Sequence, residues 1–281
     1  MKKIALILIL VCFAFGSVFA NDTFFVSARG SDSNSGLTEA QPFKTLSHAI
    51  TAIMTSGVRK IVIIGMLDLN SEGSNFPETV FRLGDPVNSI GSGEVLITGK
   101  ASASAAERAF LSARGSNKAV IWVRQNLKVR FENIDIIGAE GQRRNGGLNV
   151  SEGAQVILGQ GAVVRDNFLF GVFVDQNGTF ILDGGDVRDN YNTGVYLNTG
   201  SVFTMENGSI RHNRAANNGG GVFVSSDSSF NLTGGTITNN NSGQAGGGVL
   251  IRANARFNQS GGTINENTAG RGSNPNIFRE G

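Results

Sequence analysis

The sequence has 281 residues, of which 40% are hydrophobic and 16% are charged, with 39 glycines, 4 prolines and one cysteine. Glycine is abundant but has no three-residue period, and proline is scarce, which excludes collagen and disordered Pro/Gly-rich chains. Lys2 and Lys3 lie in an expected signal peptide, described below. Without them, the 24 Lys and Arg residues become 22, equal to the 22 Asp and Glu residues. A net charge near zero disfavours general nucleic-acid binding, and we expect no nucleic-acid partner.

Residues 1–20 are typical of a secretory signal peptide. Two lysines precede an apolar run at 4–15, and small residues lie just before the expected cut after Ala20. The apolar run is too short to span a bilayer, so we expect an exported protein without a transmembrane span, either secreted or in a bacterial cell envelope. Lipid modification of Cys12 is the competing interpretation, which the bulky Val11 before it disfavours. After a cut at Ala20, the mature chain would contain no cysteine and no disulfide.

The next predicted element is an amphipathic helix over 44–56. Its apolar residues follow helical spacing, and they are Leu46, Ala49, Ile50, Ile53 and Met54. Residues 61–64 predict a first buried strand. Residues 71–118 are rich in Ser, Gly and Ala with scattered apolar pairs, which indicates short strands joined by longer loops.

A repeat begins after this region. Similar lines of sequence start at Ile121, Leu148, Val172, Val195, Val222 and Val249. Each line holds short strands with period-two alternation, a glycine turn and a polar closing turn. The lack of helical spacing disfavours a leucine-rich repeat, and the short period disfavours a propeller blade. We therefore predict an all-β fold: a single-stranded right-handed parallel β-helix of about eight coils with one N-terminal capping helix.

The expected domain organisation follows from the repeat. Residues 21–118 form the N-terminal cap and irregular first coils, residues 119–276 form the regular repeats, and residues 277–281 form a C-terminal tail. In a solenoid, equivalent residues stack in columns at the strand spacing of about 4.8 Å. The expected inward columns are Phe180, Phe203, Phe230 and Phe257, and Val187, Ile210, Ile237 and Ile264. The expected turn columns are Gly185, Gly208, Gly235 and Gly262, at a positive φ or a tight corner, and Asn167, Asn190, Asn213, Asn240 and Asn267, whose amides would bond between coils.

Residues 24–50, FFVSARGSDSNSGLTEAQPFKTLSHAI, carry a G-S-D-x-N-x-G turn and a P-F-K-T segment. This opening resembles the cap of secreted right-handed β-helix proteins of the pectate-lyase-like superfamily, and VRFENIDIIG at 129–138 resembles one of their coils. The GGGVFV and GGTITNN lines resemble repeats of bacterial surface proteins of the polymorphic outer-membrane type. The resemblance spans 23–276 and implies the fold. It implies less about function, because the superfamily contains lyases, hydrolases and catalytically silent adhesins.

Catalytic motifs of that superfamily are missing. The strings N-T-D, D-D, G-H-G, R-I-K, W-x-D-H and R-x-P-x-x-R do not occur. Asp183, Asp186 and Asp189 flank one glycine turn, but they lack acidic equivalents two coils later and read as a solvated turn. Residues 32–36 imitate the start of a calcium loop, yet Phe43 stands where an EF-hand has Glu. We predict no catalytic residues, no metal site and no cofactor, with Ca²⁺ entering only under a lyase alternative.

A charged column and an aromatic column remain as candidate binding surfaces. The charged column contains Arg165, Arg188 and Arg211 beside Asp166, Asp189 and His212. It could hold an anionic sugar, but mutual neutralisation is the favoured interpretation. The aromatic column contains Trp122, Phe173, Tyr196 and Phe223, with Asn149 and Leu250 at the equivalent positions. Exposed rings would stack on sugars or proteins, whereas rings beneath loops would be structural, and both interpretations stay open.

The aromatic residues Trp122, Phe173, Tyr196 and Phe223 are the candidate ligand-binding residues. The predicted function is a non-catalytic, adhesin-like binding protein, secreted or in the cell envelope, whose partner would be a polysaccharide or a surface protein. The alternative is a polysaccharide lyase that cleaves uronic-acid polymers by β-elimination. No capping helix follows Asn267, so we also expect either weak self-association through the C-terminal coil or capping of this end by Ile277 and Phe278 folded back.

Overall fold

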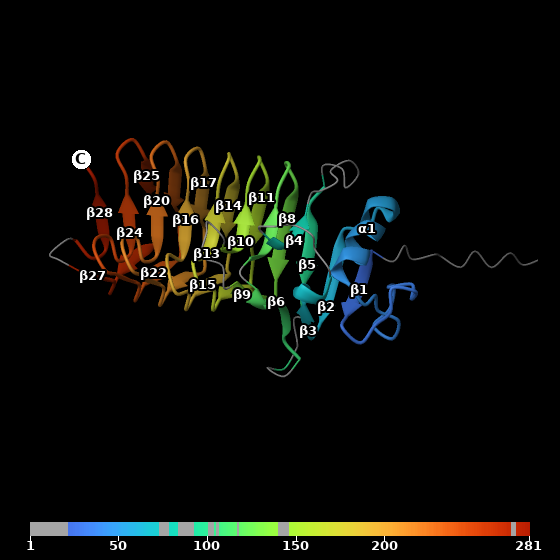
Figure 1. Cartoon of the computed structure of the whole chain (residues 1–281). Helices are drawn as coiled ribbons and strands as arrows, with labels where there is room; N and C mark the ends of the chain where they lie inside the picture. Colours follow the sequence, from blue (N-terminus) through green and yellow to red (C-terminus); the bar gives the residue numbers. More distant parts are fainter. Residues whose placement is uncertain are drawn as a thin grey trace, which may run out of the picture.

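Short segments of alternating apolar residues cannot bury their backbone polar groups alone, so each pairs with its equivalent in the coils before and after. The result is a right-handed parallel β-helix (Figure 1), seen in a computed structural model that describes residues 22–72, 79–83, 93–100, 104, 107–116, 118–139, 146–270 and 274–281. The expected signal peptide and Cys12 lie outside the described residues. No helix in the described ranges has the length and apolar character needed to cross a membrane.

Three parallel sheets run the length of the solenoid. Sheet A contains β1 (Thr23–Ser27), β2 (Lys60–Ile64), β5 (Val95–Thr98), β8 (Lys128–Glu132), β11 (Gln155–Leu158), β14 (Thr179–Leu182), β17 (Val202–Met205), β21 (Ser229–Leu232) and β25 (Arg256–Gln259). Sheet B contains β3 (Met66–Asp68), β6 (Ala109–Ser116), β9 (Ile134–Ala139), β12 (Val163–Arg165), β15 (Asp186–Arg188), β18 (Ser209–Arg211), β22 (Thr236–Thr238) and β26 (Thr263–Asn265). Sheet C contains β4 (Thr79–Leu83), β7 (Ala119–Val123), β10 (Gly146–Val150), β13 (Phe170–Val174), β16 (Val195–Leu197), β20 (Val222–Val224), β24 (Val249–Ile251) and β28 (Ile277–Arg279).

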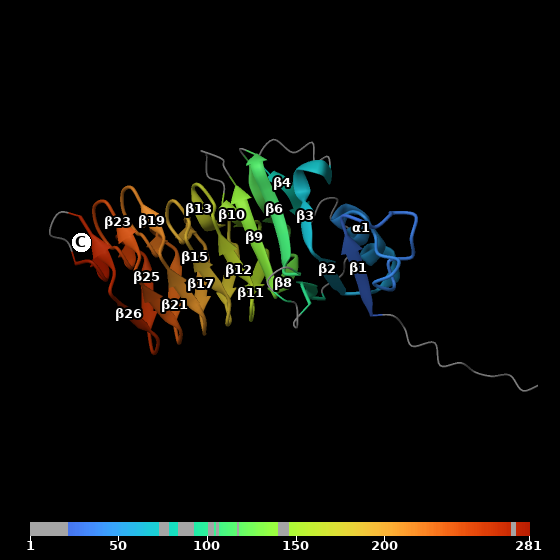
Figure 2. The same cartoon turned by 90° about the horizontal axis from the view of Figure 1, so that it is seen from below.

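A fourth, short sheet lies along one edge of the solenoid (Figure 2). It contains β19 (Arg214–Ala215), β23 (Asn241–Ser242) and β27 (Thr268–Ala269). About six turns are regular, those from β8 to β28, whereas we expected about eight coils. The count differs because the earlier coils contain longer connections and the 3-10 helix η1 (Leu69–Glu72).

The predicted register is confirmed strand by strand. Phe180, Phe203, Phe230 and Phe257 are Cα partners in sheet A, and Val187, Ile210, Ile237 and Ile264 are partners in sheet B. The first three phenylalanines are fully buried, and their rings stack at 4.7–5.2 Å between centroids. Apolar side chains that point inward from sheets A, B and C thus form one continuous core.

The asparagine column is also confirmed, and it is longer than expected. Asn190 is 1% exposed, its Nδ2 donates to Oδ1 of Asn213 at 2.9 Å, and its backbone N donates to the same oxygen at 3.1 Å. The same pair of bonds repeats from coil to coil, and Asn276 accepts the last pair from Asn267 at 3.2 and 3.3 Å. We call this series the asparagine ladder. Sequence spacing missed Asn276 because it follows Asn267 by only nine residues.

The glycine column needs one correction. Gly208, Gly235 and Gly262 have positive φ, but in the coil before them the positive φ belongs to Gly184 and not to Gly185. A Cβ atom on Gly185 would lie 2.7 Å from Cγ of Leu158, so this glycine is required by close approach instead.

The capping helix α1 (Leu46–Ser56) begins two residues later than the predicted start at 44. Thr45 is the N-cap: its backbone is extended, and its hydroxyl accepts from the backbone N of His48 at 3.1 Å. Glu72 accepts from the backbone N atoms of Leu46 and Ser47 at 2.8 and 2.9 Å. The helix ends at Gly57 in the left-handed conformation (φ 76°) and covers the N-terminal end of the core (Figure 1).

The expected tail at 277–281 contains a strand. Ile277–Arg279 forms β28, which pairs with β24 and closes the last coil in sheet C. Ile277 packs against the core, and the guanidinium of Arg279 lies 5.4 Å from the ring centroid of Phe257.

Candidate functional site

The aromatic column lies on the outer face of sheet C in the expected register. Phe173 pairs with Tyr196, and Tyr196 pairs with Phe223. The rings stack in series, with centroid separations of 5.7 Å for Phe173–Tyr196 and 4.6 Å for Tyr196–Phe223. Phe170 adds a ring that sequence reasoning missed, 5.5 Å from Phe173 and 4.7 Å from Tyr196. The column is therefore a packed aromatic stack and not a row of separate rings.

Much of this stack is covered. Phe173 and Phe223 are only 6% and 8% exposed, whereas Tyr196 is half-buried. Two segments that follow ladder asparagines, 214–219 and 241–246, fold toward sheet C, and we call them the arms. A Cβ atom on Gly219 would lie 2.9 Å from Cβ of Phe223, so this arm sits directly against the stack. The interpretation of rings beneath loops therefore holds for Phe223.

Trp122 is also engaged within the protein. Its Nε1 donates to Oγ of Ser151 at 2.7 Å, and the guanidinium of Arg124 lies 5.0 Å from its ring centroid. The guanidinium of Arg252 lies 5.5 Å from the ring of Phe223 in the same manner. Of the four candidate ligand-binding residues, Trp122 and Tyr196 thus keep partial solvent access, and the other two are buried.

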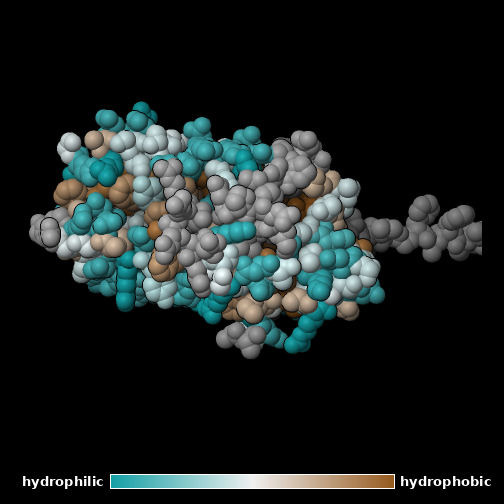
Figure 3. Space-filling view, in the orientation of Figure 1, coloured by the Kyte–Doolittle hydropathy of each residue, from teal (hydrophilic) through white to brown (hydrophobic). Residues whose placement is uncertain are grey.

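Two aromatic residues beside this stack are exposed. Phe168 is 48% exposed and Tyr191 is 65% exposed, and their ring centroids lie 6.5 Å apart. They follow the ladder residues Asn167 and Asn190, in coils whose closing turns lack an arm. The matching position of two aromatic residues after two ladder asparagines could have revealed this pair in the sequence. Much of the face in Figure 3 is hydrophilic, with hydrophobic residues in small, separate patches.

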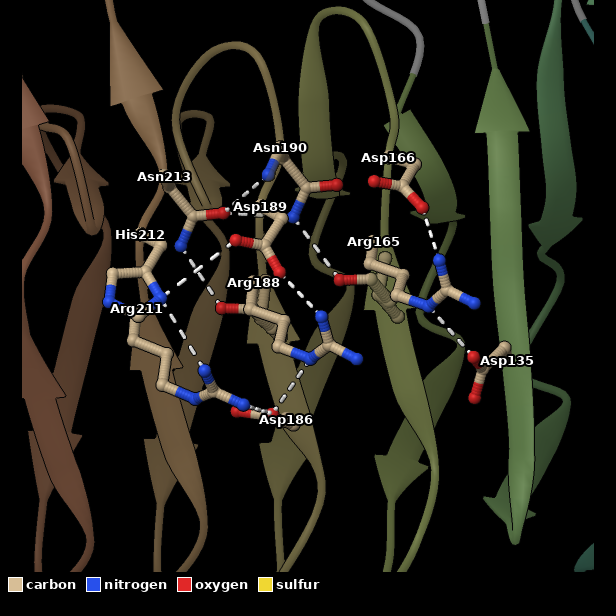
Figure 4. Close-up of polar contacts among 12 residues, drawn as sticks. Asp135, Arg165, Asp166, Asp186, Arg188, Asp189, Asn190, Arg211, His212 and Asn213 are labelled. Carbon is tan, nitrogen blue, oxygen red and sulfur yellow. Dashed lines mark hydrogen bonds and ion pairs between the residues drawn. The ribbon is translucent and has the colours of Figure 1, made fainter. Parts of the chain in front are cut away.

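The charged column lies on the outer face of sheet B, and its arginines are paired (Figure 4). Asp135 is 2% exposed and contacts Arg108 at 2.5 Å and Arg165 at 2.8 Å. Asp186 contacts Arg188 at 3.2 Å and Arg211 at 2.6 Å. This is the neutralising arrangement favoured by the sequence, and it leaves little unpaired positive charge for an anionic sugar.

The ends of the same arginines contact the residues at the corner of each coil. Arg165 also contacts Asp166, and Arg188 contacts Asp189 at 2.5 Å. Burial lowers the pKa of Arg165, but the hydrogen bond and charge of Asp135 and the charge of Asp166 outweigh it and raise the pKa. His212 is 3.8 Å from Asp189 and completes the column.

A second charged group, missed in the sequence, surrounds Arg130 on sheet A. Its guanidinium contacts Glu94 at 3.2 Å, Glu132 at 3.4 Å and Asp183 at 3.2 Å. Burial lowers the pKa of Arg130, but the hydrogen bond that it donates to Asp183 and the charges of the three carboxylates raise it overall. The three contacts with carboxylates stabilise the protonated guanidinium, which disfavours its use as a general base.

Beside this group lies a polar pocket of about 430 Å³. It is lined by Arg130 and Glu132 of β8 and by Gln160, Asp183, Gly184, Asn207 and Gly208, from the turns after β11, β14 and β17. Gln160, Gly184 and Asn207 stand at equivalent positions of successive coils, but their residue types differ from coil to coil. Sequence columns of identical residues therefore gave no signal for the pocket. Within the described residues, no three His, Cys, Asp or Glu side chains form a group that could hold a metal ion.

The chain matches no family model, and neither a curated protein nor a solved structure matches it. The parallel β-solenoid is shown by the structure itself.

Proposed function

We propose that this is a non-catalytic, adhesin-like β-helix protein, secreted or in a bacterial cell envelope, which binds a glycan or a surface protein through aromatic side chains. One observation carries the proposal: Phe168 and Tyr191 are exposed side by side, 6.5 Å between centroids. Exposed rings at fixed spacing on a rigid solenoid suit stacking against sugar rings or burial in an interface.

The binding surface consists of Phe168 and Tyr191 together with the half-buried Phe170 and Tyr196. Phe173 and Phe223 stack on Tyr196 and support it, whereas Trp122 lies further along the same column, beyond Asn149. Each accessible ring would contribute on the order of 1 kcal/mol, so binding gains strength from several rings in register. Apolar stacking carries the interaction, and binding should therefore tolerate salt.

A double substitution tests the proposal. Phe168→Ser with Tyr191→Ser removes the two exposed rings without touching the core, and the variant should remain folded by circular dichroism. Binding on an array of bacterial and plant glycans and surface proteins should be lost. A matched control is Met66→Ser, which removes the other large exposed apolar side chain among the described residues (58%). Equal binding by the wild type and the double variant would contradict the aromatic site.

The lyase alternative has one specific observation in its favour, the arginine and carboxylates beside the polar pocket on sheet A. Its test is the ultraviolet absorbance of unsaturated product after incubation with uronic-acid polymers and Ca²⁺. Turnover that disappears in an Arg130→Ala variant would support a lyase and overturn the non-catalytic assignment.

A further inference from the structure

The polar pocket is built for hydrogen bonding. Gln160 and Asn207 line it from two coils that flank the coil of Gly184, and both are exposed to solvent. In the described part of the chain, the Gln160 side chain makes no hydrogen bond, and Asn207 uses only its Oδ1, which accepts from Gly208 at 2.8 Å. An amide with unused hydrogen-bonding groups presents both a donor and an acceptor. Both residues can therefore contact a ligand without breaking a bond within the protein.

The carboxylates extend this capacity. Glu132 and Asp183 contact Arg130 through one oxygen each, Oε1 and Oδ2. Their second oxygens add acceptors to the pocket wall, while Gly184 (φ 92°) and Gly208 (φ 91°) complete the lining without a side chain. Closely spaced acceptors, amide donors and a guanidinium match a ligand that carries adjacent hydroxyl groups, since each hydroxyl both donates and accepts.

The charge of the pocket selects among such ligands. Two carboxylates and one arginine line it, and the arginine already contacts three carboxylates. A further carboxylate, such as that of a uronic acid, would meet like charge, and the single cation among the described lining residues is already paired. An uncharged sugar avoids this cost.

We infer that this pocket binds an uncharged, hydroxyl-rich sugar unit, at a site separate from the aromatic surface. The pocket crosses coils that are spaced at about 4.8 Å, so the sugar would lie along the solenoid axis. The inference does not depend on the proposed aromatic site, because it uses other residues, on β8 and in the turns between sheets A and B.

Calorimetry with the full-length protein tests the inference. The probes are cello-oligosaccharides and xylo-oligosaccharides as uncharged ligands, and galacturonate oligomers of the same length as anionic ones. An uncharged oligomer should bind, and Gln160→Ala with Asn207→Ala should weaken its binding at least about tenfold, because two hydrogen bonds are lost. The ion pairs of Arg130 are untouched in this variant.

The control variant replaces one glutamine and one asparagine outside the pocket by alanine. Gln244→Ala with Asn217→Ala changes two exposed residues of the arms that contact each other at 3.5 Å, and it should bind as the wild type does. Binding that survives the pocket variant, absence of binding to both uncharged ligands, or preference for galacturonate would each overturn the inference. Phe168→Ser with Tyr191→Ser should leave pocket binding unchanged, so failure of one site is distinguishable from failure of the other.

Discussion

The rings of Tyr196 and Phe223 lie nearly parallel on neighbouring strands of sheet C, with centroids 4.6 Å apart and planes 6° from each other. Phe223 is further enclosed by the arm at Gly219 and by the guanidinium of Arg252. An outward-facing residue of this solenoid is thus packed almost as well as a core residue.

Replacing Phe223 should therefore cost stability. Phe223→Ser removes a buried ring and its stacking contact with Tyr196. We expect a loss of about 2–4 kcal/mol in the free energy of unfolding, measured by urea titration. Tyr191→Ser, on an exposed ring, should change it by less than about 0.5 kcal/mol. Similar losses in both variants would contradict the burial of the stack.

The asparagine ladder predicts that a buried asparagine contributes more to stability than an exposed one. Asn213→Ala removes a buried amide that accepts from Asn190 and donates to Asn240, each at 2.9 Å, and it leaves the backbone N of Asn190 without its partner. We expect a loss of about 2–4 kcal/mol. Asn258, which donates to Asn231 at 3.1 Å on the exposed face of sheet A, is the matched control, and Asn258→Ala should cost under about 1 kcal/mol. Thermal melts of the two variants check the difference.

Glu72 predicts a pH dependence at the capping helix. Burial raises the pKa of Glu72 above its ordinary value of 4.5, and the hydrogen bonds from Leu46 and Ser47 lower it by less. The folded state therefore binds this proton more tightly than the unfolded state. The contribution of Glu72 to the free energy of unfolding should rise as the pH falls from neutral through the folded pKa toward 4.5.

Glu72→Ala should remove this contribution, and at neutral pH it should cost about 1 kcal/mol through loss of the helix cap. Urea unfolding at a series of pH values from 7 downward measures both effects. Glu206→Ala, on an exposed glutamate, should keep the wild-type pH dependence. A Glu72→Ala variant with an unchanged slope would show that another group causes it.

Asp135 predicts that the charged column stabilises the fold. The carboxylate is 2% exposed and contacts Arg108 and Arg165, so Asp135→Asn leaves Arg108 without its counter-ion and Arg165 with Asp166 alone. We expect a loss of about 2 kcal/mol. Asp227→Asn, an exposed residue, should be neutral within about 0.5 kcal/mol. Equal melting temperatures for wild type and Asp135→Asn would refute a structural role.

The C-terminal coil is the place where we expect weak self-association of the protein. Among the described strands, β25, β26 and β28 are the outermost of their sheets at this end. A chain that stops after Ser273 lacks β28 and Asn276, which exposes the edge of β24 and uncovers the last phenylalanine of the core column. Light scattering should then show more aggregation. Glu280→Ala, which loses only an exposed ion pair with Arg252, should behave as the wild type does.

Sequence columns could predict the fold because the solenoid is quasi-one-dimensional. Each coil places equivalent residues in the same environment, so the four phenylalanines from Phe180 to Phe257 and the five asparagines from Asn167 to Asn267 report the register directly. The capping helix was visible for a similar reason, since its apolar spacing is local.

The candidate sites depended on features that do not repeat. The arms cover Phe223 but leave Tyr191 exposed, because loop length changes between coils, and sequence periodicity carries no information about where a loop folds. The polar pocket joins Arg130, Gln160 and Asn207, which share no residue type. The sequence by itself determined the strands, their register and the buried columns, because each coil is held by its nearest neighbours. Only the tertiary structure decided which outward side chains remain accessible and which charges are paired, because those outcomes depend on contacts between residues that are not equivalent in the repeat.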